Sequence, residues 1–490
     1  MAIYHLTANV VSRARGQSAV AAAAYRMGAT LRDQRYGVTH NYAGKRGVSH
    51  AEIIAPDGAP AWVGDRQELW NRVEARELRK DSQLARLIEI ALPVELTGAE
   101  RIALMRDFVT VELVAKGMIA DFCIRGGDTN NPHAHLLLTL RSVTPGGFGP
   151  KERSWNGKAA LNEWRAAWAL RTNEHLAYAG HAVRIDHRTL AEQQIELQPG
   201  RRIGVARVRH ANGTLPPHLS ARILEQQQIA RANGELILED PTVALRALTH
   251  QRTTFTHDEL ARYLRSRTHD EVQFAAVLAA VTESSELVAL APVRGQATFT
   301  SRDMIEAEKS LMRRTASMTG RRGHGLAADN HEVAAATATL SEAGRRAFDY
   351  LVSEGDAKAL PVTAAMKAPL LMAAHRAWEA AGWVVRGAAP SSKAASNLEI
   401  LTGIRSQSLA ECEDQWQQGV DLGRETVLIV DGAQTLGLKQ LERVLAAVDR
   451  ARAKAVLLAD VDKLQALRVQ SPFRDVLRGA TPVDLAETGL

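Results

Sequence analysis

The stretch Asn131-Pro-His-Ala-His-Leu-Leu-Leu-Thr139 places two histidines, two residues apart, at the start of an apolar run. Such a run is typical of a β-strand, in which successive side chains alternate between the two faces. His133 and His135 therefore point to the same face, with their Cα atoms roughly 6–7 Å apart. Two neutral imidazoles on a rigid strand can supply half of a metal site. The alternative interpretation is that these are two half-buried surface histidines that bind no metal.

The composition narrows the class of protein. A chain of 490 residues is too long for one core and predicts several domains. The two cysteines exclude a disulfide framework and fit a reducing cytoplasm, where we expect the protein to act. We expect no signal peptide and no membrane insertion, because no apolar stretch has the length or flanks for either. A net charge of +6 fits an anionic partner without requiring one.

The first part of the chain alternates between helical and strand-like patterns. The order predicts an α/β sandwich with an antiparallel sheet and flanking helices. Ser18 is a good N-cap for the alanine-rich helix that follows it. We expect strands at 1–12, 89–92, 119–124 and 133–140, and helices at 19–27, 68–87, 98–116 and 155–179.

After the first part of the chain, the pattern of polar and apolar residues changes twice. The middle of the chain is polar, charged and mostly helical in pattern, whereas continuous apolar runs at 426–430 and 455–458 lie between helices near the end. Such runs indicate a parallel sheet that is covered on both faces. We therefore expect three domains, at residues 1–195, 196–335 and 336–490.

Tyr25 lies near the end of the predicted helix 19–27 and is a candidate nucleophile. A tyrosine can attack a phosphodiester and hold the end of a DNA strand covalently. Its phenol is a weak nucleophile at a pKa near 10, so a cation that polarises the phosphate would help it. The alternative is that Tyr25 packs on the core. By chemistry alone Tyr4, Tyr36 and Tyr42 are rival nucleophiles.

Several motifs occur together. They are MAIYHL at 1–6, SAVAAAAYR at 18–26, LWNRVE at 69–74, RKDSQLAR at 79–86 and PHAH at 132–135. Together they resemble the MobA/MobL relaxases, and within them the TraA-type conjugative transfer proteins, which join a relaxase to a helicase.

The resemblance implies an HUH-type relaxase fold and a role in plasmid mobilisation or conjugative transfer. In such a protein one strand is nicked at an origin of transfer, and the matching tyrosine, Tyr25, becomes linked to the 5′-phosphate. His133 and His135 match two histidines that hold a divalent metal, with Mg or Mn expected. The partners implied are single-stranded DNA, relaxosome accessory proteins and a coupling protein.

The chain departs from the family pattern at two positions. Arg125 stands where a third histidine is expected, and Leu87 where a glutamate is expected. An arginine cannot ligate a cation. Water, Asp121 or Asp128 would then complete the metal site, or the Arg125 guanidinium would replace the charge of the metal. Otherwise nicking is impaired, and the chain is a relaxase-fold DNA-binding protein acting in relaxosome assembly. Glu74 and Glu89 are accessory carboxylates.

Basic and aromatic residues follow the histidine strand. Basic side chains pair with phosphates and aromatic rings stack on bases, which suits single-stranded DNA. Trp164 and Trp168 are four residues apart, which favours a core stripe, so Trp155 and Phe148 are better stacking candidates. The expected DNA-binding residues are Arg26, Arg141, Lys151, Arg153, Trp155 and Lys158.

Residues 340–347 and 377–382 resemble the start of a RecD-like helicase domain. A phosphate-binding loop of the pattern GxxxxGK[ST] should lie between them, but Pro361 to Ala368 keeps only Lys367. Gly432 stands where a catalytic glutamate should follow the strand 427–431. We therefore expect a partial RecA-like domain that lacks Walker residues, with Lys367 vestigial and no ATP binding, ATPase or helicase activity.

Overall fold

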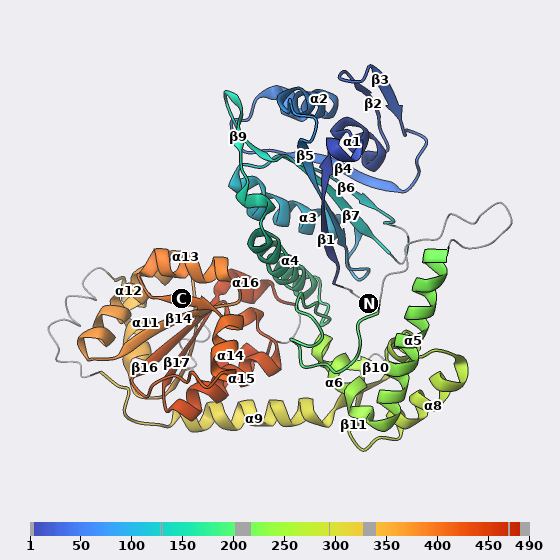
Figure 1. Ribbon diagram of the computed structural model, residues 1–490. Coiled ribbons are helices and arrows are strands. Elements are labelled where there is room, and N and C mark those ends of the chain that lie inside the picture. Colours follow the sequence, from blue (N-terminus) through green and yellow to red (C-terminus); the bar gives the residue numbers. More distant parts are fainter. Residues whose placement is uncertain are drawn as a thin grey trace. The chain divides into compact units, whose positions relative to one another are not determined.

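A computed structural model describes residues 4–127, 129, 131–200, 217–293, 295–326, 340–468 and 471–480. The chain forms two compact units, one centred on residues up to 187 and one on most of the remainder (Figure 1). Each unit is described by itself. Within the described residues, no helix has both the length and the apolar character needed to cross a membrane.

The first unit is built on an antiparallel sheet, as predicted, and this sheet has five strands. The central strand β7 carries the two histidines and pairs with β5 on one side and β6 on the other. The order is β1 (Leu6–Ser12), β5 (Gln83–Ala91), β7 (His133–Leu138), β6 (Ala120–Arg125) and β4 (Val48–Ile54).

Helices cover both faces of this sheet (Figure 1). On one face α3 (Gly98–Glu112) and α4 (Lys158–Tyr178) pack over Phe122 and Leu136. On the other, α1 (Ala19–Met27) and α2 (Arg66–Arg76) pack over Ala85 and Leu137. Since alternate residues share a face, His133 and His135 belong to the face of Leu137 and α1.

The sequence explains where α1 begins and ends. The Ser18 hydroxyl accepts a hydrogen bond from the Ala21 amide at 3.2 Å, as an N-cap should. Buried alanines let the helix lie close to the sheet. Gly28 ends the helix in the left-handed conformation, with φ of 64°.

The predicted helix 68–87 is wrong in its second half. Helix α2 ends at Arg76, and residues from Gln83 belong to β5, which is much longer than the strand predicted at 89–92. Pairing with β1 and β7 on both sides outweighs the helical propensity of this stretch. Two hairpins were also not predicted: β2 (Thr30–Asp33) with β3 (Val38–Asn41), and β8 (Arg141–Thr144) with β9 (Gly147–Lys151).

The second unit begins with a helical region, as predicted, but this region also holds a three-stranded sheet in the order β10-β12-β11. From α6 to β12 the elements follow in the order helix, strand, helix, helix, strand, strand. The elements of this region are α5 (Pro217–Glu239), α6 (Pro241–Gln251), β10 (Phe255–Thr256), α7 (His257–Arg265), α8 (Glu271–Thr282), β11 (Leu287–Val293), β12 (Gln296–Ser301) and the following α9 (Arg302–Thr319).

The rest of the second unit holds the predicted parallel sheet. Its order is β13 (Ala357–Val362), β17 (Lys454–Asp460), β16 (Thr426–Asp431), β14 (Val384–Ala389) and β15 (Ser406–Ser408). All its pairings are parallel.

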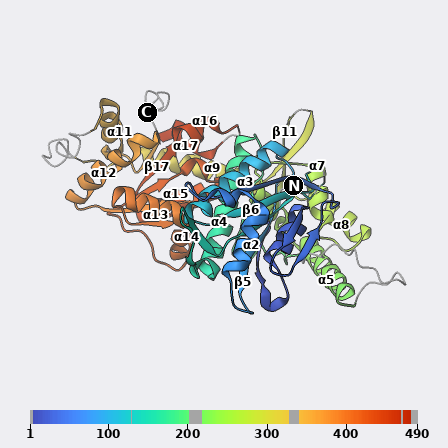
Figure 2. The same cartoon turned by 90° about the horizontal axis from the view of Figure 1, so that it is seen from above.

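Helices cover this sheet too. Helices α11 (Glu342–Val352) and α12 (Ala364–Ala380) pack on the face of Val427 and Ile429. Helix α9 packs against α15 (Leu438–Ala451) and α17 (Pro472–Ala480) (Figures 1 and 2). The remaining helices are α13 (Ser392–Thr402), α14 (Leu409–Gln417) and α16 (Val461–Ala466). The division into three domains at 195 and 335 stays a prediction.

Candidate active site

Tyr25 lies in the last turn of α1 with 49% of its side chain exposed. The Lys45 ammonium lies 3.0 Å from the centre of its ring and donates a hydrogen bond to its backbone carbonyl at 3.2 Å. The ring of Tyr42 meets it edge-on, with centroids 5.2 Å apart. These contacts hold the aromatic ring in place while much of the side chain stays open to solvent.

The charges around Tyr25 favour its ionised form. Lys45, as a hydrogen-bond donor and as a positive charge, lowers the pKa of the Tyr25 phenol, and the charges of Arg125 and Arg26 act in the same direction. Partial burial of the phenol opposes this effect. A lower pKa provides more phenolate at neutral pH, and phenolate is the stronger nucleophile.

The two histidines have their rings 5.2 Å apart and nearly perpendicular. His133 donates its Nδ1 proton to the Asn131 carbonyl at 2.8 Å, which leaves the Nε2 lone pair free, as in a metal-ligating histidine. Burial lowers the pKa of His135 to about 4, so this imidazole is neutral at pH 7. Its Nδ1 atom is buried without a hydrogen-bond partner among the described residues. Both rings can therefore donate a lone pair.

The neighbouring strands add one carboxylate and one guanidinium to this face. Glu89 lies opposite His135 on β5, and Arg125 lies opposite His133 on β6. The Cys123 thiol donates to the carbonyl of Arg26 at 3.2 Å, which ties the end of α1 to β6. The structure thus brings Tyr25, the two histidines, Glu89 and Arg125 to the same region of the first unit.

The described residues do not form a complete metal site. Among them, no group of three or more His, Cys, Asp or Glu side chains is arranged to hold a metal ion. Asp121 is fully buried and accepts hydrogen bonds from Arg66 at 2.8 Å and from the Trp70 indole at 2.9 Å, so it does not face the histidines as a ligand. Asp128 lies outside the described residues. The histidine pair supplies two ligands only.

Glu74 lies at the other end of α1 from Tyr25. Its buried carboxylate accepts hydrogen bonds from the Ala19 amide at 2.7 Å and from Arg13 at 2.5 Å. A carboxylate at the start of a helix stabilises the exposed amides there. Glu74 thus positions the helix that carries Tyr25. Leu87 is on the histidine face, two residues from Glu89, and packs against the α1 core.

The expected DNA-binding residues divide into three groups. Arg141 and Lys151 share one carboxylate partner, Glu77, at 2.9 and 3.1 Å, so their two positive charges are only partly balanced. Arg153 and Lys158 are exposed and have no ion pair within the described ranges. Arg26 is partly buried and donates to the Ala22 carbonyl at 3.1 Å.

The expectation that Trp155 stacks on bases is wrong. Its side chain is only 8% exposed and belongs to the core under α4, so it offers no ring face to a strand. Trp164 and Trp168 are buried in the same core, which confirms that they form a core stripe. Phe148 packs edge-on against Trp62, with centroids 5.2 Å apart.

The rival tyrosines are placed less favourably than Tyr25. Tyr4 packs against the α3 and α4 side of the sheet, and burial raises the pKa of its phenol well above the usual value. Tyr36 lies in the turn between β2 and β3. Tyr42 contacts the Tyr25 ring and lies just after β3.

The segment in which a phosphate-binding loop is expected, Pro361 to Ala368, runs from the end of a strand into a helix. The connection between the two is too short for such a loop. Strand β13 ends at Val362 and α12 begins at Ala364, so Thr363 alone connects them. The Lys367 ammonium pairs with Asp431 at 2.9 Å. This pair links the first helical turns after β13 to the end of β16.

Comparison with known proteins now identifies the family. A sequence model of the MobA/MobL family matches residues 17–212, and a model of an AAA domain matches residues 339–488. A mobilization protein MobL of Acidithiobacillus ferridurans is 35% identical, over 49% of this chain and 72% of that protein. The chain belongs to the MobA/MobL family.

Two further proteins are similar to this chain. A probable conjugal transfer protein TraA of Sinorhizobium fredii is 33% identical over 97% of this chain, which spans about half (47%) of that protein. A solved structure titled "Molecular Basis of Vancomycin Resistance Transfer in Staphylococcus aureus" is 37% identical and covers 38% of this chain and 100% of the solved chain, with a TM-score of 0.37.

All the residues grouped around Tyr25 fall within the MobA/MobL part of the chain. No sequence motif singles out Lys45, although its ammonium contacts the Tyr25 ring. The only signal is that Lys45 and Arg46 stand between Gly44 and Gly47, as expected of a tight basic turn. Nothing in the sequence indicates that this turn lies beside the end of α1.

Proposed function

We propose that this MobA/MobL-family chain is a relaxase that nicks single-stranded DNA at an origin of transfer, with Tyr25 as its nucleophile. The observation that carries the proposal is the position of Tyr25, half exposed at the end of α1 with the Lys45 cation 3.0 Å from its ring. The chain spans only about half of the length of the TraA relatives that it matches. The activity of the whole protein is therefore proposed here from the site around Tyr25.

The reaction is a transesterification. The Tyr25 oxygen attacks the phosphorus, a new bond forms between them, and the bond from phosphorus to the 3′ oxygen breaks. The phenol loses its proton, and the leaving oxygen takes one up to become a 3′-hydroxyl. The DNA is then joined to Tyr25 through its 5′-phosphate, and the number of phosphodiester bonds is conserved.

Positive side chains supply the electrostatic help that this reaction needs. Lys45, Arg125 and Arg26 all act on the Tyr25 phenol, so a phosphate that reaches its oxygen also meets their charge. Arg153 and Lys158 are free to pair with phosphates of the DNA backbone on either side of the nicked bond. We keep Mg²⁺ or Mn²⁺ as a proposed cofactor, for which His133 and His135 would be the protein ligands beside oxygens of water or DNA.

A second function has one observation in its favour. Arg125 lies opposite His133, where the family resemblance implies a third ligand, so the described residues offer no group of three ligands. On this alternative the chain is catalytically impaired and binds origin DNA for relaxosome assembly. Both alternatives share the same partners: single-stranded DNA, relaxosome accessory proteins and a coupling protein.

The AAA part of the chain is proposed to be inactive as an ATPase or helicase. The single residue between β13 and α12 cannot offer the row of backbone amides that surrounds a phosphate chain. We propose that residues 336–490 keep a degenerate RecA-like domain and that residues 196–335 connect it to the relaxase domain at residues 1–195. We also propose that the protein acts in the cytoplasm, where its two free cysteines stay reduced.

The test is a search for a covalent adduct. Oligonucleotides tiling one strand of the DNA that flanks the gene are incubated with the full chain in Mg²⁺, Mn²⁺ or EDTA and run on a denaturing gel. We expect an adduct with the wild type and with Tyr36→Phe, and none with Tyr25→Phe. Tight binding without an adduct under all conditions would favour the DNA-binding alternative.

A further inference from the structure

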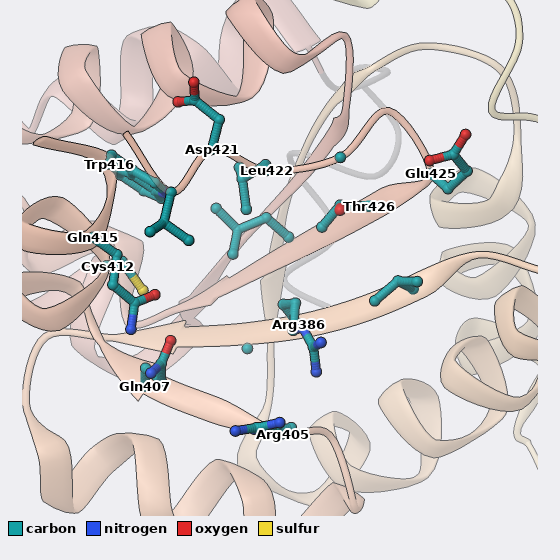
Figure 3. A pocket seen from close by; sticks show the side chains of 15 residues that line it. Arg386, Arg405, Gln407, Cys412, Gln415, Trp416, Asp421, Leu422, Glu425 and Thr426 are labelled. Carbon is teal, nitrogen blue, oxygen red and sulfur yellow. The ribbon is translucent and has the colours of Figure 1, made fainter. Parts of the chain in front are cut away.

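A cavity of about 440 Å³ lies against the parallel sheet of the second unit (Figure 3). It is lined by the amino-terminal halves of β14 and β16, by β15, by α14 and by the loop that follows α14. Arg386 is in register with Leu428, three residues before Asp431, so the cavity is roughly 10 Å along the strands from the Lys367–Asp431 pair. It is therefore separate from the degenerate phosphate site.

Two arginines lie side by side on the sheet wall of the cavity. Gly387 pairs with Ser406, and the Gly387 amide donates to the Arg405 carbonyl at 2.9 Å, so Arg386 and Arg405 are neighbours across the two strands. A side chain at position 387 would collide with Ser406, so glycine permits this close approach.

Neither arginine has an ion pair or a side-chain hydrogen bond within the described part of the chain, and both are exposed. Two like charges directly opposite each other on a sheet repel and destabilise it. An anion held between them would remove this cost. Guanidinium groups match phosphate well, because their planar donors can bind two oxygens at once.

The opposite wall has a different chemistry. Trp416, Gln415 and Cys412 come from α14, and Asp421 follows in the loop (Figure 3). An indole face can stack on a nucleobase. Burial raises the pKa of the Cys412 thiol to about 11, so this side chain stays uncharged beside a ligand. Asp421 can accept hydrogen bonds from a sugar hydroxyl or a base amino group.

The two walls together match the two ends of one ligand. The arginine wall suits a phosphate, the tryptophan wall suits a base, and the volume is within the range of small-molecule sites. We propose that this cavity binds a nucleotide, either free or as a unit of single-stranded DNA, with its phosphate between Arg386 and Arg405 and its base on Trp416. This site does not depend on nicking by Tyr25.

The test uses the full chain and four probes: dTMP, a single-stranded oligothymidylate, inorganic phosphate and a polyglutamate peptide. Calorimetric titration should show saturable binding of dTMP, the strand, or both. Binding of dTMP identifies a free nucleotide as a ligand, and binding of the strand alone identifies DNA. Arg386→Gln and Arg405→Gln should each weaken binding at least tenfold, and Trp416→Phe should lessen the fluorescence quenching that the ligand causes.

Two control variants check that the probes bind in this cavity. Arg376→Gln removes an exposed arginine from α12, on the other face of the sheet, and should leave binding unchanged. Arg346→Gln, on an exposed residue of α11, should also bind the probes as the wild type does. The proposal is overturned if neither dTMP nor the strand binds, if phosphate binds as tightly as dTMP, or if a polyglutamate peptide binds more tightly than either nucleotide probe.

Discussion

The Lys45 ammonium contacts Tyr25 twice, lying 3.0 Å from the centre of its ring and donating to its backbone carbonyl at 3.2 Å. One cation thus fixes the end of α1 and sets the charge around the phenol. Lys45 comes from the turn before β4, which carries no motif of its own, so the environment of Tyr25 depends on an element far from the histidine strand in the sequence.

Replacing Lys45 with methionine should slow adduct formation at neutral pH, because a phenol with a higher pKa provides less phenolate. Lys45 lowers the pKa of Tyr25, so its removal raises this pKa. The rising limb of the pH–rate profile should therefore move to higher pH. Lys45→Arg should retain most of the rate, and Lys80→Met, on an exposed lysine, should have no effect. An unchanged profile for Lys45→Met would show that Lys45 only packs against the ring.

Arg125→His should create a third imidazole opposite His133. We expect this variant to bind Mn²⁺ at least tenfold more tightly than the wild type in a calorimetric titration, because it adds a ligand and removes a positive charge. Arg32→His, on an exposed residue of β2, is the matched control. Equal affinity in the variant and the wild type would show that the histidine pair is not half of a metal site.

Glu74→Ala should destabilise the first unit by roughly 3 kcal/mol, because it leaves Arg13 and the Ala19 amide without their buried partner. The loss can be measured by urea unfolding. Glu68→Ala removes an exposed pair with Arg72 and should cost at most about 0.5 kcal/mol. If both variants lose the same small amount, Glu74 does not hold α1.

Lys454 should make stability depend on pH. Burial, together with the nearby charge of Lys358, lowers the pKa of Lys454 to about 7, whereas an unfolded lysine titrates near 10.4. Between these pH values the unfolded chain binds a proton that the folded chain does not, so the folded state gains stability as the pH rises.

Lys454→Met removes this dependence. The free energy of unfolding of the variant, minus that of the wild type, should fall by a few kcal/mol as the pH rises from 7 to 10, at about 1.4 kcal/mol per pH unit. Urea unfolding of both proteins at several pH values measures it. A constant difference would mean that Lys454 keeps its proton in the folded state, held by the Ser353 carbonyl at 2.7 Å.

The elements with strong local signals could be predicted from the sequence. Ser18 and Gly28 mark the ends of α1, and Thr97 with Glu100 forms the capping box that begins α3. The parallel sheet followed from continuous apolar runs. Strand β4 was missed because Ser49, His50 and Glu52 interrupt its apolar pattern, and it is held by pairing with β6.

The candidate site could be predicted only in part. The identity of Tyr25 and the common face of His133 and His135 followed from the pattern, and their roles stay predictions. The sequence could not show that Arg141 and Lys151 both pair with Glu77, or that Asp121 is held by Arg66 and Trp70. These ion pairs join residues far apart in the chain, so no local pattern records them.

The central claim is that Tyr25 carries the DNA. The most direct measurement isolates the adduct formed with single-stranded origin DNA, digests it and identifies the modified peptide by mass spectrometry. We expect a 5′-phosphate linked to the peptide that contains Tyr25. Attachment to Tyr4, Tyr36 or Tyr42, or the absence of any adduct on DNA that the chain binds tightly, would contradict it.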